Sequence, residues 1–179
     1  MAEAFVNQVN RAVGIVTSSS NASIGVGLTW MAGISTAHVA IHDIVDNANF
    51  IVGTKVTLVG VSSVQLDRAS TNTVAATASN VSFLGPTTSY TSASATKSIL
   101  IGGTFANNTA NSVNLTVTVY DNSATTESQL AAKIPVPTGS SFVISDAGKT
   151  VLEGDDEVRV YCDVENAIDV NLSILKGVS

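Results

Sequence analysis

Apolar and polar residues alternate at every second position through much of the second half of the chain, which is the periodicity of a β-strand. The clearest example is Val113–Tyr120, where valine and leucine alternate with asparagine and threonine. The runs Val158–Val164 and Ala167–Leu175 follow the same pattern. Together with Ser98–Phe105 and Leu130–Val136, they predict five strands. Two shorter strands are expected to complete the sheets, at Phe142–Ile144 and Thr150–Leu152.

Turn-forming residues separate these runs. Examples are Asp121-Asn-Ser, Thr138-Gly-Ser, Asp146-Ala-Gly and Glu153-Gly-Asp-Asp. Several short strands with such turns between them indicate a sandwich or barrel. We therefore expect residues 97–179 to form an antiparallel β-sandwich, jelly-roll-like in its topology. Helix-forming composition occurs only at Thr126–Lys133, where Pro135 would end a helix after one short turn.

The remaining residues predict three further segments. Residues 1–30 are expected to be an extended docking arm, because their short alternating runs carry too few large apolar residues for a core. Residues 31–80 predict a small β module that includes a strand at Thr54–Val59. Residues 81–96 are rich in serine and threonine and contain a proline, which is typical of an exposed linker. The expected fold class is all-β from end to end.

Charge is sparse and unevenly distributed. Only 12% of the 179 residues are charged, against about 25% in an ordinary domain. The net charge of −6 arises entirely after position 120, because residues 1–120 carry as many bases as acids. A surface with so little charge repels its own copies weakly, which favours a homo-oligomer. The chain has no basic stripe, so direct binding of nucleic acid is not expected.

The sequence predicts no signal peptide, no membrane span and no disulfide. The first residues have neither the basic start nor the apolar stretch of a signal peptide. The most apolar window, Ile24–Ile41, is interrupted by hydroxyl groups, a histidine and three glycines, so we expect no membrane span. The single cysteine, Cys162, excludes an intrachain disulfide. It lies in a strand-like run, and we expect its thiol to be packed in the core.

Four carboxylates between positions 153 and 157 are the weak candidates for a metal site: Glu153, Asp155, Asp156 and Glu157. Carboxylates are good calcium ligands. However, the segment lacks the alternating oxygen ligands and the glycine-to-glutamate spacing of an EF-hand loop. We favour a solvated turn over a calcium site.

Two histidines, His38 and His42, stand four residues apart with Asp43 and Asp46 nearby. On a helix this spacing would place two metal ligands on one face. The surrounding Thr36–His42 looks like a strand, where residues four apart are too distant to chelate simply, so a surface or interface pair is favoured. The sequence also lacks a Gly-x-Ser-x-Gly elbow, a Walker loop and a dinucleotide fingerprint. We therefore predict no enzyme activity, no catalytic residues and no cofactor.

Two stretches resemble proteins of tailed bacteriophages. Ile44–Gly60, followed by Val64–Thr71, is similar to a small β module of phage fibre, tail and capsid-associated proteins. In both, a Gly-capped strand precedes a strand of valine, leucine, small residues and threonine. The C-terminal stretches Lys149–Val160 and Ala167–Leu175 resemble the end of small virion structural proteins of marine phages, especially those of cyanobacteria.

The resemblance implies a non-enzymatic structural component of a tailed-phage virion, at the neck, collar or tail. Its expected partners are other copies of itself and the portal, neck, tail or capsid subunits. It would assemble in the cytoplasm of the host bacterium, where the lack of cysteine pairs suits the reducing conditions. Two alternatives stay open: a capsid decoration or cement protein, and an adhesin module that binds host glycans.

Overall fold

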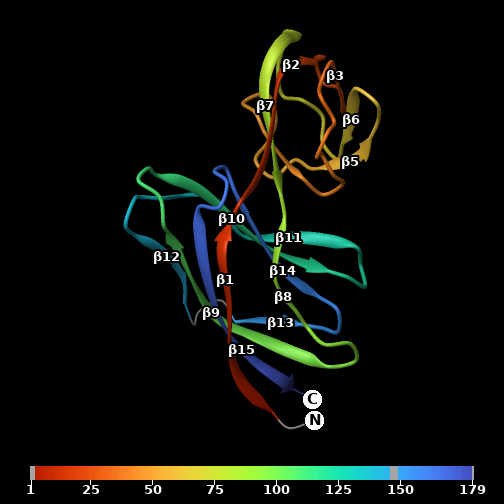
Figure 1. The fold of residues 1–179 in the computed structure, drawn as a ribbon. Coiled ribbons are helices and arrows are strands. Elements are labelled where there is room, and N and C mark those ends of the chain that lie inside the picture. The colour runs from red at the N-terminus through yellow and green to blue at the C-terminus, as the bar shows by residue number, and fades with distance from the viewer. Residues whose placement is uncertain (1–2, 146–148, 179) are drawn as a thin grey trace. The chain divides into compact units, whose positions relative to one another are not determined.

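The computed structural model describes residues 3–145 and 149–178, and within them the chain is built entirely from β-strands and turns. The chain forms two compact units (Figure 1). One unit, which we call the sandwich, contains the residues up to Gly14 and those from Thr87 onward. The other, which we call the inserted unit, is Ile15–Pro86. No helix in the described residues is long and apolar enough to cross a membrane.

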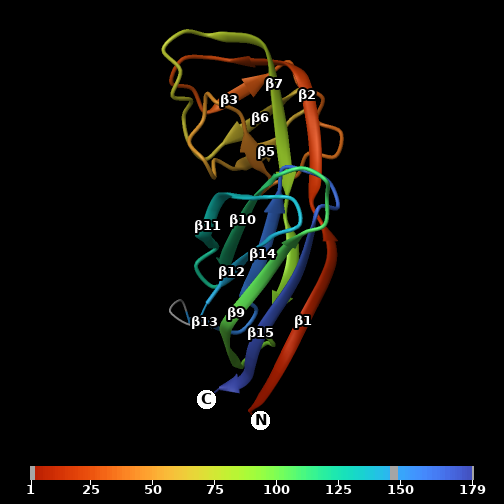
Figure 2. The same ribbon diagram turned by 90° about the vertical axis from the view of Figure 1, so that its left-hand side faces the viewer.

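The sandwich consists of two antiparallel sheets. The first sheet has the order β1 (Ala4–Val13), β15 (Ile168–Val178), β9 (Lys97–Asn107), β12 (Ser141–Ile144), and β13 (Thr150–Leu152) also pairs with β9. The second sheet has the order β11 (Thr126–Val136), β10 (Val113–Asp121), β14 (Glu157–Cys162), β8 (Thr87–Thr91). Figure 2 shows β9, β15 and β1 side by side in the first sheet.

The strand order is that of a jelly roll. β12 and β13 pair with successive parts of β9, from Ser141 opposite Ala106 to Leu152 opposite Ser98, so they share one strand position. Each sheet then has four positions. From β8 onward, with β12 and β13 taken as one strand position, successive strands cross from one sheet to the other, except for the β10–β11 hairpin. The prediction of an all-β chain with an antiparallel sandwich is confirmed.

The core of the sandwich lies between its two sheets and follows the alternation of the sequence. Leu115 and Val117 of β10 are fully buried, as are Leu172 and Ile174 of β15. Both sheets contribute to one cluster of buried apolar side chains, which also includes Phe105. Because neighbouring strand residues point to opposite faces, every second residue enters this core.

The structure divides the chain differently from the four predicted segments. The expected docking arm, residues 1–30, supplies edge strand β1 to the sandwich and then β2 (Ile15–Ile24) to the inserted unit. The expected linker, residues 81–96, is mostly strand, because it contains the end of β7 (Ala76–Gly85) and all of β8. Threonine favours strands, and pairing with β14 gives β8 its place in a sheet.

The inserted unit is a single six-stranded sheet with its own core. Its strand order is β4 (Ile44–Asp46), β7, β2, β3 (Trp30–Ala32), β6 (Ser63–Leu66), β5 (Val56–Val59). The buried side chains include Ile24, Met31 and Phe83. The unit extends beyond the predicted module of residues 31–80, because the long strands β2 and β7 pair with each other.

Two local predictions remain: a possible helical turn and a turn before β13. The segment Thr126–Lys133, for which one helical turn was the alternative, lies in strand β11. Pairing with β10 stabilises the extended conformation there despite helix-forming residues. The predicted turn at Asp146-Ala-Gly lies outside the described residues.

Candidate functional site

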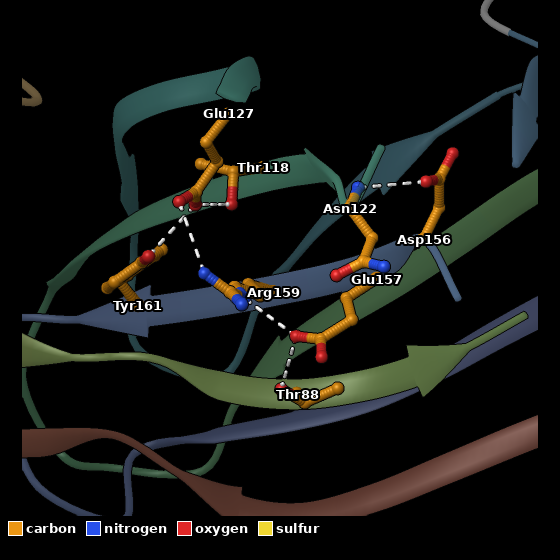
Figure 3. Close-up of polar contacts among 8 residues, drawn as sticks. All are labelled: Thr88, Thr118, Asn122, Glu127, Asp156, Glu157, Arg159 and Tyr161. Atoms are coloured by element: carbon orange, nitrogen blue, oxygen red, sulfur yellow. Dashed lines mark hydrogen bonds and ion pairs between the residues drawn. The ribbon is translucent and has the colours of Figure 1, made fainter. Parts of the chain in front are cut away.

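A set of interacting polar side chains lies on the outer face of the second sheet (Figure 3). We call it the charged network, and its members are Thr88, Thr118, Tyr120, Glu127, Glu157, Arg159 and Tyr161. The strand register brings them together, because Thr118 stands opposite Arg159, and Tyr120 stands opposite both Glu127 and Glu157. Residues directly opposite each other on paired strands share a face. Four strands therefore contribute to one face.

Arg159 lies at the centre of the charged network. Its Nε donates to Oε2 of Glu157 at 2.7 Å, and its Nη1 lies 3.5 Å from Oε2 of Glu127. Its guanidinium also covers the ring of Tyr120, 3.9 Å from the centroid. Burial alone would lower the pKa of Arg159, but the hydrogen bond to Glu157 and the charges of Glu157 and Glu127 raise it overall. The side chain is only 11% exposed and keeps its positive charge.

Glu127 accepts from two hydroxyl groups as well. Tyr161 Oη donates to Glu127 Oε1 at 2.9 Å, and Thr118 Oγ1 donates to the same oxygen. Burial and the negative charge of Glu127 raise the pKa of Tyr161 well above its ordinary value, so the phenol stays protonated and remains a donor. These side-chain contacts join strands β10, β11 and β14. The charged network therefore cross-links the second sheet.

Three of the four candidate metal ligands contact different partners. Asp156 is buried and closes its own turn, because its carboxylate accepts from the backbone N–H of Asn122 and of Glu153. Glu157 is held by Arg159, and Glu153 forms an exposed ion pair with Lys97 at 3.0 Å. Within residues 3–145 and 149–178, no cluster of three His, Cys, Asp or Glu side chains could hold a metal ion. Asp155 is exposed in the turn itself, with a φ of +68°, so three of the four candidates hold separate partners and the fourth faces solvent.

The two histidines lie in turns of the inserted unit. The expected strand at Thr36–His42 is wrong, because His38 and His42 have φ angles of +66° and +78°. The neighbouring Asp43 is buried and accepts a hydrogen bond from the N–H of Ala40 at 2.8 Å. Burial raises the pKa of Asp43 above its ordinary value. The segment is shaped by backbone turns around a buried carboxyl group.

A buried thiol and a surface hollow are two further positions with reactive or polar side chains. Cys162 is buried in the sandwich core, as expected, and burial raises the pKa of its thiol. An open hollow of about 370 Å³ in the inserted unit is lined by serines of β2 and by Asn80, Val81 and Ser82 of β7. Its hydroxyls contact each other, as at Ser18 and Ser82, whose oxygens are 3.3 Å apart. Neither position brings together a nucleophile and a base.

The outer face of the first sheet carries apolar side chains, in contrast to the charged network on the second sheet. Phe5, Leu175, Ile99 and Val151 are successive cross-strand neighbours on β1, β15, β9 and β13. We call them the apolar row. Phe5 is 77% exposed and Val151 is 55% exposed, while the two residues between them are half-buried. Val9 and Val143 are also exposed on the outer edges of this sheet.

Sequence reasoning missed the apolar row because its members come from four separate parts of the chain. Each alone is an apolar residue at an outward position of a strand, which is common on protein surfaces. Only the register of the sheet places them next to one another. The one signal in the sequence is the pair Phe5 and Val9, which lie on the same face of β1.

The comparisons with known proteins leave the family open. No known protein family and no curated protein matches the sequence. Among solved structures, the isomalto-dextranase of Arthrobacter globiformis T6, complexed with panose, is 12% identical over 97% of this chain, with a TM-score of 0.25. The chain spans 34% of the length of that protein. A likeness this weak carries no argument about fold or function.

Proposed function

We propose that the protein is a non-enzymatic structural component of a tailed-phage virion that assembles with copies of itself and with other virion proteins. The observation that carries this proposal is the apolar row on the outer face of the first sheet. An apolar stripe that crosses a whole sheet and is exposed at both ends is typical of an interaction surface. The low charge of the chain also supports self-assembly, because it weakens the repulsion between copies.

The charged network gives the proposal indirect support. Its acids and its base contact each other and nearby hydroxyls, so they act as a cross-link of the sheet. Arg159 also covers one face of the Tyr120 ring, on which a sugar would otherwise stack. The geometry therefore favours a structural role over the glycan-binding alternative.

The placement at the neck, collar or tail rests on the resemblance of Ile44–Thr71 and of the C-terminal strands to phage virion proteins. A capsid decoration protein would carry the same kind of sandwich, since jelly rolls are common in capsid proteins. Copy number separates these two positions in the virion, because a decoration protein covers many capsomers and a neck or tail ring contains few subunits.

The test is quantitative mass spectrometry of purified virions of the phage that encodes the chain, with the portal protein as the internal standard. We expect a copy number comparable to that of the portal, which corresponds to a neck, collar or tail ring. A copy number comparable to that of the major capsid protein would assign the chain to capsid decoration instead. Absence from the particle would overturn the proposal.

A further inference from the structure

β1 is the open edge of the first sheet. It spans Ala4–Val13 and pairs on one side with β15, while its other side has no strand partner in the described part of the chain. Long open edges with apolar side chains tend to pair with another strand. Proteins usually prevent this with charges, prolines or bulges along the edge. In β1 the only bulge lies at the far end, between Asn10 and Val13.

The outward residues next to this edge are self-complementary. Glu3, Phe5, Asn7, Val9 and Arg11 are all exposed and occupy every second position. The pattern is symmetric about Asn7. The apolar Phe5 and Val9 lie two residues from it on either side, and the charged Glu3 and Arg11 lie four residues from it. The two charges have opposite sign, and neither Glu3 nor Arg11 has an ion-pair partner among the residues described.

We propose that β1 pairs antiparallel with β1 of a second copy, about a two-fold axis at Asn7. In this register Glu3 faces Arg11 of the partner copy, Phe5 faces Val9, and Asn7 faces itself. A two-fold interface repeats each contact. The inference rests on the self-assembly in the proposed function, and it names the surface and the partner.

The pairing would join the two first sheets into one continuous sheet. Nine residues on each copy, Glu3–Arg11, would form about eight to ten backbone hydrogen bonds. The apolar row of one copy would then continue into Val9 of the other. A shift of the register by two residues would place Glu3 opposite Val9 and Phe5 opposite Asn7, so charges and apolar groups would lose their matching partners.

The first test exchanges the charges in the full-length chain. Glu3→Arg places two arginines opposite each other, and Arg11→Glu places two glutamates opposite each other. Each single variant should raise the dimer dissociation constant, measured by analytical ultracentrifugation, about tenfold or more. The double variant Glu3→Arg/Arg11→Glu restores opposite charges and should return the constant close to the native value. Lys133→Glu, an exposed charge reversal on β11 at an edge of the second sheet, is the matched control.

The second test uses a disulfide at the axis. Asn7→Cys places two thiols directly opposite each other, where Cβ atoms are about 4.5–5.5 Å apart, and it should form a covalent dimer under mild oxidation. Ser173→Cys is the control, because Ser173 stands opposite Asn7 on β15. Its two copies would be separated by three strand spacings, about 14 Å, which is too far for a disulfide. The native chain should not cross-link, since Cys162 is buried.

A monomer at all concentrations would overturn the inference, and so would a dimer that is unaffected by the charge variants or that Asn7→Cys does not cross-link. In the last two outcomes the chain still forms a dimer. They would show that the dimer interface lies elsewhere, while self-assembly itself would stand. The proposed function is tested separately by the presence of the chain in virions. Rescue by the double variant together with cross-linking at Asn7 would establish the β1 interface.

Discussion

Glu127 and Arg159 face each other across the second sheet, with 3.5 Å between Oε2 and Nη1 and side chains that are only 5% and 11% exposed. Buried charges are costly unless they are paired, so this contact ties two parts of the chain together. Glu127 follows Thr126 at the start of β11, and Arg159 lies in β14. The pair therefore bridges the strands on both sides of β10.

We expect Arg159→Met to lower the free energy of unfolding by about 3 kcal/mol, because it leaves a buried carboxylate without its cation. The double variant Glu127→Gln/Arg159→Met should lose less than the sum of the two single variants, since neither charge is then unpaired. Urea unfolding measures all three. Arg68→Met is the matched control, because Arg68 is 47% exposed beside Asp67, and its loss should stay below about 0.5 kcal/mol. An equal loss in the free energy of unfolding for the Arg159→Met and Arg68→Met variants would contradict a structural role of the Glu127–Arg159 pair.

The buried carboxyl group of Asp43 predicts a pH dependence. Burial raises its pKa above the ordinary value of 3.8, so the folded protein binds this proton more tightly than the unfolded chain. The contribution of Asp43 to stability is therefore lost as the pH rises through the window above 3.8. We expect Asp43→Asn to be more stable relative to the native chain at pH 7 than at pH 3, as measured by thermal unfolding.

Asp121 provides a control of opposite sign. The N–H of Ala124 and the hydroxyl of Ser123 lower the pKa of Asp121. Its contribution to stability is therefore present above the unfolded pKa and is lost as the pH falls through the folded pKa. Asp121→Asn should lose stability relative to the native chain as the pH rises. The same trend in both variants would show that the environment of Asp43 is not the cause.

Gly14 follows β1 and has a backbone that only glycine adopts easily. Its φ is +136°, and a Cβ at this position would lie 2.2 Å from the carbonyl oxygen of Val164. We expect Gly14→Ala to cost roughly 3 kcal/mol or more in chemical unfolding, because the backbone must shift as well as strain. Gly139→Ala is the control. Gly139 also has a positive φ, +66°, but its Cβ would meet nothing within 4 Å, so the cost should be about 1 kcal/mol.

The insertion between β1 and β8 predicts that the sandwich folds without residues 15–86. The two ends of the inserted unit are adjacent, because Ile15 pairs directly with Gly85. Each unit also has its own cluster of buried apolar residues. Replacing residues 15–86 by a short Gly-Ser linker should therefore leave a chain that shows a β-type circular dichroism spectrum and cooperative thermal unfolding. An unfolded or aggregated product would mean that the sandwich depends on the inserted unit.

The alternation in β10 and β15 was enough to predict the sandwich and its inward residues. Strand formation there depends on a period of two within one segment, which the sequence displays directly. The segment Leu130–Val136 was predicted too short, since β11 begins at Thr126 and includes residues of helix-forming composition. The acidic segment contains the expected turn at residues 154–155, but Asp156 is buried and Glu157 begins β14, and pairing with distant segments decides both.

The sequence by itself determined the all-β class, the core faces of the sandwich strands and the low charge of the surface. The tertiary structure alone decided that residues 4–13 are an edge strand, that residues 15–86 are an insertion, and that Glu127 meets Arg159. The reason is physical. Side-chain alternation is a property of neighbouring residues, whereas sheet order and register depend on pairing between segments far apart in the chain, such as Phe5 with Leu175.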